Sequence, residues 1–388
     1  MVTDLWQAPD APVPPRSGKF TAPAAPDQGA QYQGSPYQGS DPGQGWAPPP
    51  KPGLIPLRPI GFGTLLGASF QVLRRNPKAT FGSGLIVQAA IMLVTVVIVG
   101  LVTFWALDRI DSAPLDQRDA VTAGSVLAGA LSLIIPVALS LIASALLQAV
   151  IVVEVARATL GEKLRLGTLW RRAATRLWPL TLWTLLLTVA LLIGMAVIAG
   201  IVVLLVSVGD VAGIVVGVLV GVFGALLLTA GSAFIYTKTS AVPSLIVLEK
   251  LGVRASVIRS WSLTRGYFWR TLGVLLLVGL IVQVISQIIT TPVSLLFGVG
   301  TVLVDPTGAF AEQSSILSVV VSLIIAIPVA AVAAVVQSAA VALVYLDLRM
   351  RKEGLDLELV RYVESTEQGG NVSDPYLAPA ESGGYPAA

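Results

Sequence analysis

The chain lacks two residue types on which much protein chemistry depends: its 388 residues include no cysteine and no histidine. Without cysteine there are no disulfides and no thiolate nucleophiles, and without either residue there are no Cys/His zinc sites. The absence of histidine also excludes haem ligation by imidazole and catalysis by a Ser-His or Cys-His pair. We therefore expect no cofactor and no metal, and few enzyme chemistries remain open.

Charged residues are also scarce. They make up 12% of the chain and hydrophobic residues 55%, against about 25% and roughly 45–50% in soluble domains. The apolar residues are gathered in runs that exceed the roughly 20 residues needed to cross the ~30 Å hydrocarbon core as a helix. The composition predicts an all-α polytopic membrane protein.

Six apolar runs are long enough to be transmembrane spans. They cover residues 81–107, 123–153, 177–207, 211–236, 271–299 and 316–345. Only residues 208–210 separate the third span from the fourth, which predicts a tight antiparallel hairpin. Pro136, Pro292 and Pro328 fall within spans. We expect kinks there and no breaks, because neighbouring helices can satisfy the backbone groups that proline frees.

Two tails flank the predicted membrane domain, which covers residues 54–363. Residues 1–53 are rich in Pro, Gly and Gln and have too few apolar side chains to build a core, so we expect disorder. Residues 364–388 are predicted to be a second flexible tail. The start of the chain shows no secretory signal pattern, so the first span is expected to act as the membrane anchor.

Basic residues alternate in density between successive connections. They gather before the first span, between the second and third, between the fourth and fifth, and after the sixth, whereas the opposite connections carry mainly acidic residues. By the positive-inside rule, the basic side faces the cytoplasm. We expect a multi-pass plasma-membrane protein with both termini cytoplasmic.

A basic, amphipathic segment precedes each odd-numbered span. The segments are "GTLLGASFQVLRRNP" at 63–77, "LRLGTLWRRAATRLWP" at 164–179 and "EKLGVRASVIRSWSLTRGYFWR" at 249–270. In the third segment the apolar face is predicted to hold Val253, Val257, Trp261, Thr264 and Phe268. The pattern predicts three repeats, each an amphipathic surface helix followed by a two-span hairpin.

The side chains of these segments have the composition of a membrane interface. Arginines pair with anionic lipid headgroups, and tryptophans favour the interface itself. Nucleic-acid surfaces combine the same residue types but need a solvent-facing platform, so we expect membrane lipids as partners and no nucleic acid. The candidate interface residues are Arg74, Arg75, Arg171, Arg172, Arg176, Arg254, Arg259, Arg265, Arg270, Trp170, Trp178, Trp261 and Trp269.

Five glutamines lie inside the apolar runs: Gln88, Gln148, Gln283, Gln287 and Gln337. Hydrogen bonds between helices are the favoured explanation, and a polar lining for a solute pathway is the alternative. No charged residue lies in the cores of the spans, which disfavours ion-driven transport. Glycines that would let helices approach closely are Gly194, Gly200, Gly217, Gly221 and Gly224.

Acidic residues near the basic segments could serve as catalytic bases, yet none forms a recognisable site. We find no pair of carboxylates at useful spacing, no P-loop and no GxSxG motif. Glu154 is predicted to pair locally with Arg157, and Glu249 to begin or cap the surface helix, where its charge suits the positive end of the helix dipole. The sequence predicts a protein without catalytic activity.

The run "PSLIVLEKLGVRASVIRSWSLTRGYFWRTLG" resembles the signature of a bacterial integral-membrane family, the glycerophosphoryl diester phosphodiesterase membrane domain. The resemblance extends over about residues 57–360 and is strongest to the stand-alone, six-span branch of high-GC Gram-positive bacteria. The phosphodiesterase activity belongs to a separate, fused domain with carboxylate metal ligands and catalytic histidines, so it is not implied for this chain. The resemblance implies a six-span fold of uncharacterised function that places or assists partners acting on lipids. The matching residues include Pro243, Glu249, Ser260, Trp261, Arg265, Gly266, Phe268 and Trp269.

Two functions remain open. The favoured one is a non-catalytic, lipid-interacting scaffold or accessory subunit of a membrane complex, whose Pro-rich N-terminal tail, cheap to order, recruits a soluble protein partner. The alternative is a passive transporter or flippase-like carrier for a lipid or glycerophospho compound. A carrier needs a cavity lined by Gln148, Gln283, Gln287 and Gln337, whereas the interior of a scaffold is expected to be packed shut.

Overall fold

The structure is a computed structural model that describes residues 53–208, 211–304, 311–367 and 373–377. The chain divides into two units, Met1–Pro48 and Pro49–Ala388. The N-terminal tail predicted for 1–53 lies outside the described residues except for Gly53. The following description therefore concerns the second unit.

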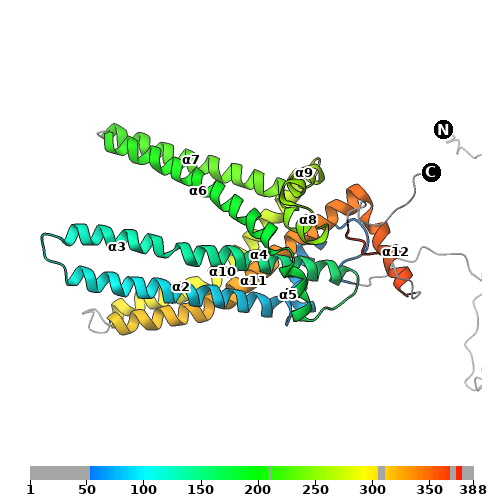
Figure 1. Cartoon of the computed structure of the whole chain (residues 1–388), viewed down its shortest axis with the longest axis horizontal. Helices are drawn as coiled ribbons and strands as arrows, with labels where there is room; N and C mark the ends of the chain where they lie inside the picture. Colours follow the sequence, from blue (N-terminus) through cyan, green and yellow to red (C-terminus); the bar gives the residue numbers. More distant parts are fainter. Residues whose placement is uncertain (1–52, 209–210, 305–310, 368–372, 378–388) are drawn as a thin grey trace, which may run out of the picture. The chain divides into compact units, whose positions relative to one another are not determined.

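All regular structure in the described residues is helical, which confirms the all-α prediction (Figure 1). The helices are α1 (Phe62–Arg75), α2 (Thr80–Asp111), α3 (Arg118–Ser132), α4 (Ile134–Thr159), α5 (Leu166–Ala174), α6 (Leu177–Val208), α7 (Val211–Lys238), α8 (Val242–Leu248), α9 (Val253–Thr264), α10 (Phe268–Val304), α11 (Ala311–Glu353) and α12 (Leu355–Glu367).

Six helical segments are long and apolar enough to cross a membrane, as predicted. They are Thr80–Asp111, Arg118–Thr159, Leu177–Ser207, Val211–Leu248, Phe268–Phe297 and Leu317–Glu353. The second segment consists of α3 and α4, which meet at Leu133, three residues before Pro136. Leu133 keeps a helical backbone (φ −72°, ψ −15°), so the proline interrupts the hydrogen-bond ladder without ending the span. Pro292 and Pro328 lie inside α10 and α11.

Helix α11 is the centre of the bundle, because it packs against α1, α2, α4 and α10. Helices α6 and α7 pack mainly against each other (Figure 1). Glycines bring these two helices close, as the sequence predicted. A Cβ atom on Gly194 would lie 2.7 Å from Leu228 Cδ1, and one on Gly224 would lie 3.1 Å from Ile198. Gly200, by contrast, has open space in front of it.

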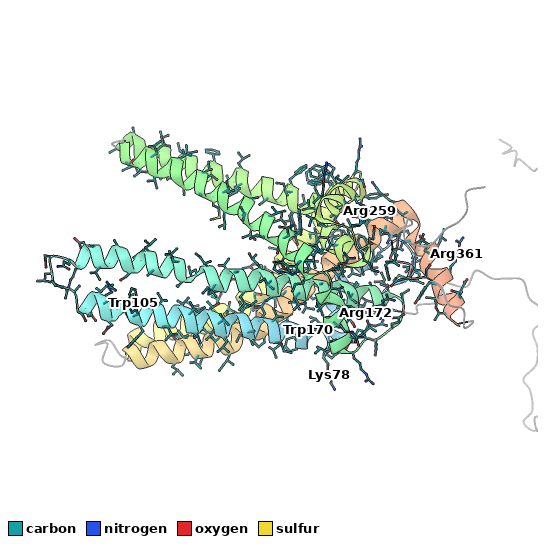
Figure 2. The ribbon with its side chains drawn as sticks, viewed as in Figure 1. Lys78, Trp105, Trp170, Arg172, Arg259 and Arg361 are labelled. Atoms are coloured by element: carbon teal, nitrogen blue, oxygen red, sulfur yellow. The ribbon has the colours of Figure 1, made fainter. Side chains whose placement is uncertain are left out.

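The most deeply buried residues lie at the end of the bundle where the short helices gather. Residues 149–152 of α4 and Leu343 and Tyr345 of α11 have no exposed surface. Figure 2 shows Lys78, Arg172, Arg259 and Arg361 at this end, which we call the basic end, and Trp105 at the opposite end. Elsewhere the spans present apolar side chains outward, as a hydrocarbon environment requires.

Helix α9 corrects the predicted apolar face of the third amphipathic segment. Its buried residues are Ser256, Ser260, Leu263 and Thr264, whereas Trp261 is 45% exposed. The Ser260 hydroxyl donates a hydrogen bond to the carbonyl of Lys238 at the end of α7 (2.8 Å). Small serines allow this close approach, which the periodicity of larger apolar residues did not reveal.

The C-terminal tail also differs from the prediction that residues 364–388 are flexible. Helix α12 continues to Glu367, and residues 373–377 pack against the bundle. The hydroxyl of Tyr376, which is 1% exposed, donates to the carbonyl of Ala156 (2.8 Å) near the end of α4. Asp374 pairs with Arg157. The last carbonyls of a helix have no intrahelical partner, and Tyr376 supplies one.

Candidate functional site

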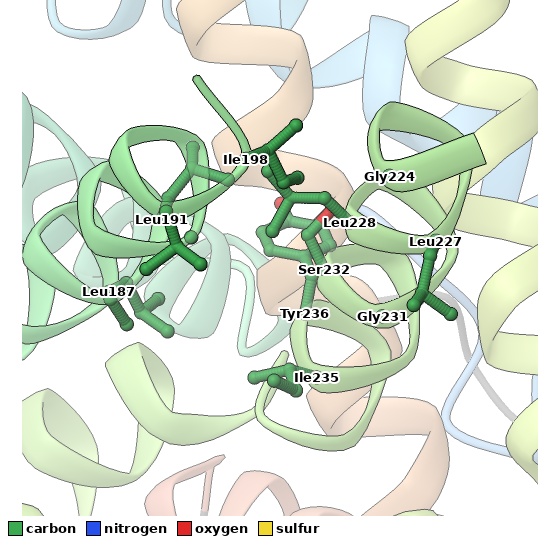
Figure 3. A pocket seen from close by; sticks show the side chains of 13 residues that line it. Leu187, Leu191, Ile198, Gly224, Leu227, Leu228, Gly231, Ser232, Ile235 and Tyr236 are labelled. Carbon is green, nitrogen blue, oxygen red and sulfur yellow. The ribbon is translucent and has the colours of Figure 1, made fainter. Parts of the chain in front are cut away.

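An apolar cavity lies between α6 and α7. It has a volume of about 580 Å³ and is lined by residues of α6 from Leu187 to Ile198 and of α7 from Gly224 to Tyr236. Figure 3 shows Leu187 and Leu191 of α6 on one side and Leu227 of α7 on the other. Nearly all the lining is apolar. Leu227, which is 76% exposed, places part of this lining on the surface of the span.

A second, polar cavity of about 190 Å³ lies among four spans. Glutamines from three helices line it: Gln88 of α2, Gln148 of α4 and Gln337 of α11. Tyr236 of α7, the fourth helix, also lines this cavity. Helix α11, which contacts both α2 and α4, brings together glutamines that lie far apart in the sequence. The alternative prediction of a glutamine-lined cavity is therefore met for Gln148 and Gln337, with Gln88 as a further member.

A third cavity, of about 120 Å³, borders the other two. It shares Gln148, Tyr236 and Val341 with the polar cavity and Leu187 and Tyr236 with the apolar cavity. Tyr236 therefore lines all three. The three cavities together place an apolar space beside a polar one inside the membrane-spanning region.

The polar groups of this site have no protein partners. Within the part of the chain that the structure describes, no hydrogen bond joins the side chain of Gln88, Gln148, Gln337 or Tyr236 to another protein group. The prediction that glutamines hydrogen-bond across helices is wrong for these three. Gln88 and Gln148 are partly buried, and Gln337 and Tyr236 are exposed. Their polar atoms are therefore open to water or to a ligand.

Gln283 and Gln287 do not belong to the site. Both lie on α10 with exposed side chains, and Gln287 Oε1 accepts a hydrogen bond from Thr291 one turn away (3.3 Å). The expectation that these two glutamines line the same cavity as Gln148 is wrong. Hydropathy placed all five inside the spans, but it cannot tell which side of a fully apolar helix faces the bundle.

The candidate interface residues are divided between exposed and paired groups. Exposed side chains are Arg74, Arg171, Arg172, Arg254, Arg265, Trp178, Trp261 and Trp269; partly buried ones are Arg75, Arg176, Arg259, Arg270 and Trp170. The indole Nε1 of Trp170 donates to the hydroxyl of Ser83 (2.9 Å), so this ring contributes to packing between α5 and α2. Trp178 and Trp269, each about four-fifths exposed at 81% and 80%, fit a membrane interface.

Arg259 belongs to a charge cluster centred on Glu249, which sequence reasoning missed. Glu249 is fully buried; its carboxylate lies 2.6 Å from Arg259 and 3.6 Å from Arg349, and it accepts a hydrogen bond from Tyr345 (2.9 Å). The prediction that Glu249 begins the surface helix is wrong, because it ends α8 and α9 starts at Val253. In the sequence, the feature that could have indicated this cluster is the spacing of Tyr345 and Arg349, which lie one turn apart on α11.

Arg270 is also engaged in the fold. Its guanidinium pairs with Asp347 of α11 (3.2 Å), which pairs in turn with Arg351 (2.9 Å). Asp347 accepts a hydrogen bond from the backbone of Ile60, and Arg351 donates to the carbonyl of the same residue. Fewer cations are thus free to meet lipid phosphates than the sequence predicted.

Glu154 has a different partner from the one predicted. Its carboxylate accepts a hydrogen bond from the side chain of Asn76 (3.0 Å), whereas Arg157 pairs with Glu162 (3.8 Å) and with Asp374. Glu154 is 1% exposed, and its second oxygen has no hydrogen-bond partner. The helix spacing suggested a local pair, but Arg157 turns toward the C-terminal segment.

An all-helical bundle with six membrane-length helices and an uncharged cavity within them defines a polytopic membrane protein with an intramembrane site. Residues 66–348 match a family model described as a domain of unknown function, DUF7847, and the chain belongs to this family. Comparison with curated proteins and with solved structures gives no match.

Proposed function

We propose that the protein is a non-catalytic, multi-pass protein of the plasma membrane that binds a lipid inside its bundle and acts as a passive lipid carrier. The observation that supports this function is the apolar cavity between α6 and α7, which shares Tyr236 with a cavity lined by unpaired glutamines. A scaffold is expected to have a closed interior. The carrier is therefore the better supported of the two hypotheses.

The chemistry of the chain favours binding over catalysis. The chain contains no histidine and no cysteine, and the buried Glu249 and Asp347 are held by arginines. Among the described residues, no group of three acidic side chains could hold a metal ion. The resemblance to the glycerophosphoryl diester phosphodiesterase membrane domain agrees with a function that involves lipids, without the activity of the fused domain.

The arrangement in the membrane forms part of the same proposal. The basic end faces the cytoplasm, and the three units of a surface helix plus two spans are α1 with α2–α4, α5 with α6–α7, and α9 with α10–α11. Helix α5 carries the exposed Arg171 and Arg172, and helix α9 carries the exposed Arg254 and Trp261. These residues would hold the basic end against anionic headgroups.

The carrier hypothesis predicts that filling the apolar cavity displaces lipid. Gly231 lines this cavity, and a Cβ atom there would meet no atom within 4 Å, so Gly231→Leu introduces a bulky apolar side chain at an open position. Gly200→Leu on α6 is the matched control, because Gly200 has equally open surroundings outside the cavity lining. We expect Gly231→Leu to reduce the lipid retained in native mass spectrometry by about tenfold, or ~1.4 kcal/mol, and Gly200→Leu to retain it.

The same measurement distinguishes the scaffold hypothesis, which is favoured by the exposed Arg171, Arg172, Arg254 and Arg265. A specific polypeptide retained through the N-terminal tail, together with only generic anionic lipid, would support an accessory subunit. Equal lipid retention by the wild-type protein and both glycine variants would count against the carrier.

A further inference from the structure

The three adjoining cavities contain no charged lining residue. The polar cavity is lined by the glutamines Gln88, Gln148 and Gln337, by serines, and by Tyr236, with apolar residues between them. The third cavity adds Thr184, Thr239 and Ser240. An amide offers both hydrogen-bond donors and an acceptor, and a hydroxyl group does the same. The site is therefore equipped to bind groups that both donate and accept hydrogen bonds, such as hydroxyls.

The nearest lysine is directed elsewhere. Lys238 follows Tyr236 by two residues, but its ammonium group lies 5.4 Å from the ring centre of Trp261 and 5.6 Å from that of Phe268. Arg259 is held by Glu249, and Arg270 by Asp347. A phosphate that entered the polar cavity would meet amides and hydroxyls without a counterion, and an isolated charge in such surroundings is strongly disfavoured.

We infer that the polar cavity binds the uncharged, hydroxyl-bearing headgroup of a lipid whose acyl chain occupies the apolar cavity between α6 and α7. This inference rests on the proposed lipid-binding function and adds the class of lipid. The combined apolar and polar spaces match an amphipathic molecule. The polar cavity of about 190 Å³ is many times the ~10–15 Å³ that one water molecule needs, which is enough for a small polyol head.

Tyr236 is a positioning residue in this arrangement because it lines all three cavities. Its ring borders the apolar cavity, and its hydroxyl has no protein partner in the described residues. The first hydroxyl of a bound headgroup would meet this side chain where the acyl chain ends. Loss of the Tyr236 hydroxyl should therefore weaken binding of the hydroxylated lipid and leave purely apolar binding unchanged.

The test uses three lipids that share their acyl chains. Dioleoylglycerol has a free hydroxyl, dioleoyl phosphatidic acid has a phosphate in its place, and trioleoylglycerol has neither. Each is titrated into nanodiscs that contain the full-length protein, and binding is measured by native mass spectrometry. We expect dioleoylglycerol to bind at least about tenfold more tightly than phosphatidic acid. This preference corresponds to a difference in binding free energy of at least ~1.4 kcal/mol.

Variants with a matched control assign the preference to the glutamines. Gln148→Leu and Gln337→Leu are expected to abolish the preference for dioleoylglycerol over trioleoylglycerol, and Tyr236→Phe is expected to reduce it. Gln283→Leu on α10, an exposed glutamine outside the cavities, is expected to leave it unchanged. Thermal unfolding in detergent and size-exclusion profiles confirm that each variant is folded.

Each other outcome has a definite meaning. Equal or tighter binding of phosphatidic acid would overturn the headgroup inference while the lipid-carrier function stands. Binding of none of the three lipids would overturn both. If free glycerol displaces dioleoylglycerol, and glycerol still binds to Gly231→Leu, the polar cavity takes a soluble polyol and the assignment to a lipid is wrong.

Discussion

At the scale of single residues, the buried carboxylate of Glu249 is the most consequential polar group of the basic end. Arg349 is nearly as buried, with 3% of its side chain exposed, and both Arg259 and Arg349 lie within ion-pair distance of Glu249. The buried Arg349 and the partly buried Arg259 thus share Glu249, a fully buried acid that is distant in sequence from Arg349. Removing one partner of such a cluster leaves uncompensated charge in an apolar environment.

We predict that Glu249→Gln destabilises the protein by ~3 kcal/mol, because the amide preserves the shape of the side chain but not the charge that balances Arg259 and Arg349. The measurement is thermal or denaturant unfolding in detergent. Glu353→Gln is the control: Glu353 pairs with the same two arginines but is 30% exposed, so its loss should cost about 1 kcal/mol or less. Equal effects of the two substitutions would contradict the central place of Glu249.

At the scale of elements, the end of α4 is the point where both terminal segments meet the bundle. The backbone N–H of Leu54 donates to the carbonyl of Ala158 (2.8 Å), and the hydroxyl of Tyr376 donates to that of Ala156 (2.8 Å).

Burial raises the pKa of the Tyr376 hydroxyl above its usual range. The neutral donor therefore persists throughout the physiological pH range. This contribution to stability is present below the usual tyrosine pKa of about 10 and is lost as pH rises through the higher folded-state value.

We predict that Tyr376→Ala releases residues 373–377 from α4, because the substitution removes the ring and the hydrogen bond together. Limited proteolysis should then cleave after α12 about tenfold faster, and Tyr376→Phe, which loses ~1 kcal/mol of hydrogen bonding, should lie between. Tyr362→Phe on α12 is the control, since its hydroxyl has no hydrogen-bond partner in the described part of the chain. Identical cleavage of all the variants would mean that Tyr376 does not hold the segment.

The elements also show how far the sequence leads and why. The six spans were predictable because an apolar run of sufficient length has one stable solution in a bilayer, a helix. Which faces of those helices meet was not predictable: hydropathy is uniform around α10, so Gln283 and Gln287 could not be separated from Gln148 and Gln337. Glu249 lies 96 residues from Tyr345. Such a contact depends on the packing of α8 against α11, which no local pattern encodes.

At the scale of the whole molecule, the charge distribution across the bundle is the strongest indication of orientation. Arginines of α5 and α9, such as Arg172 and Arg259, gather at the basic end. Asp111 at the end of α2, Asp116 in the connection and Asp119 in the first turn of α3 lie together in the sequence of the α2–α3 hairpin. The exposed basic side chains Arg171 and Arg172 would remain on the side of synthesis under the positive-inside rule. The surface that meets cytoplasmic partners and the anionic leaflet is then the one built by α5 and α9.

Cysteine labelling can test this orientation without background, because the chain contains no cysteine. Ser112 follows α2 at the end opposite the basic end, and Ala174 ends α5; both are exposed. We predict that a membrane-impermeant maleimide labels Ser112→Cys in intact cells and labels Ala174→Cys only after the membrane is opened. Labelling both variants after lysis serves as the reactivity control. The reverse pattern would place both termini outside. Equal labelling of the two variants in intact cells would mean that the chain inserts in both directions. Charge would then not determine its topology.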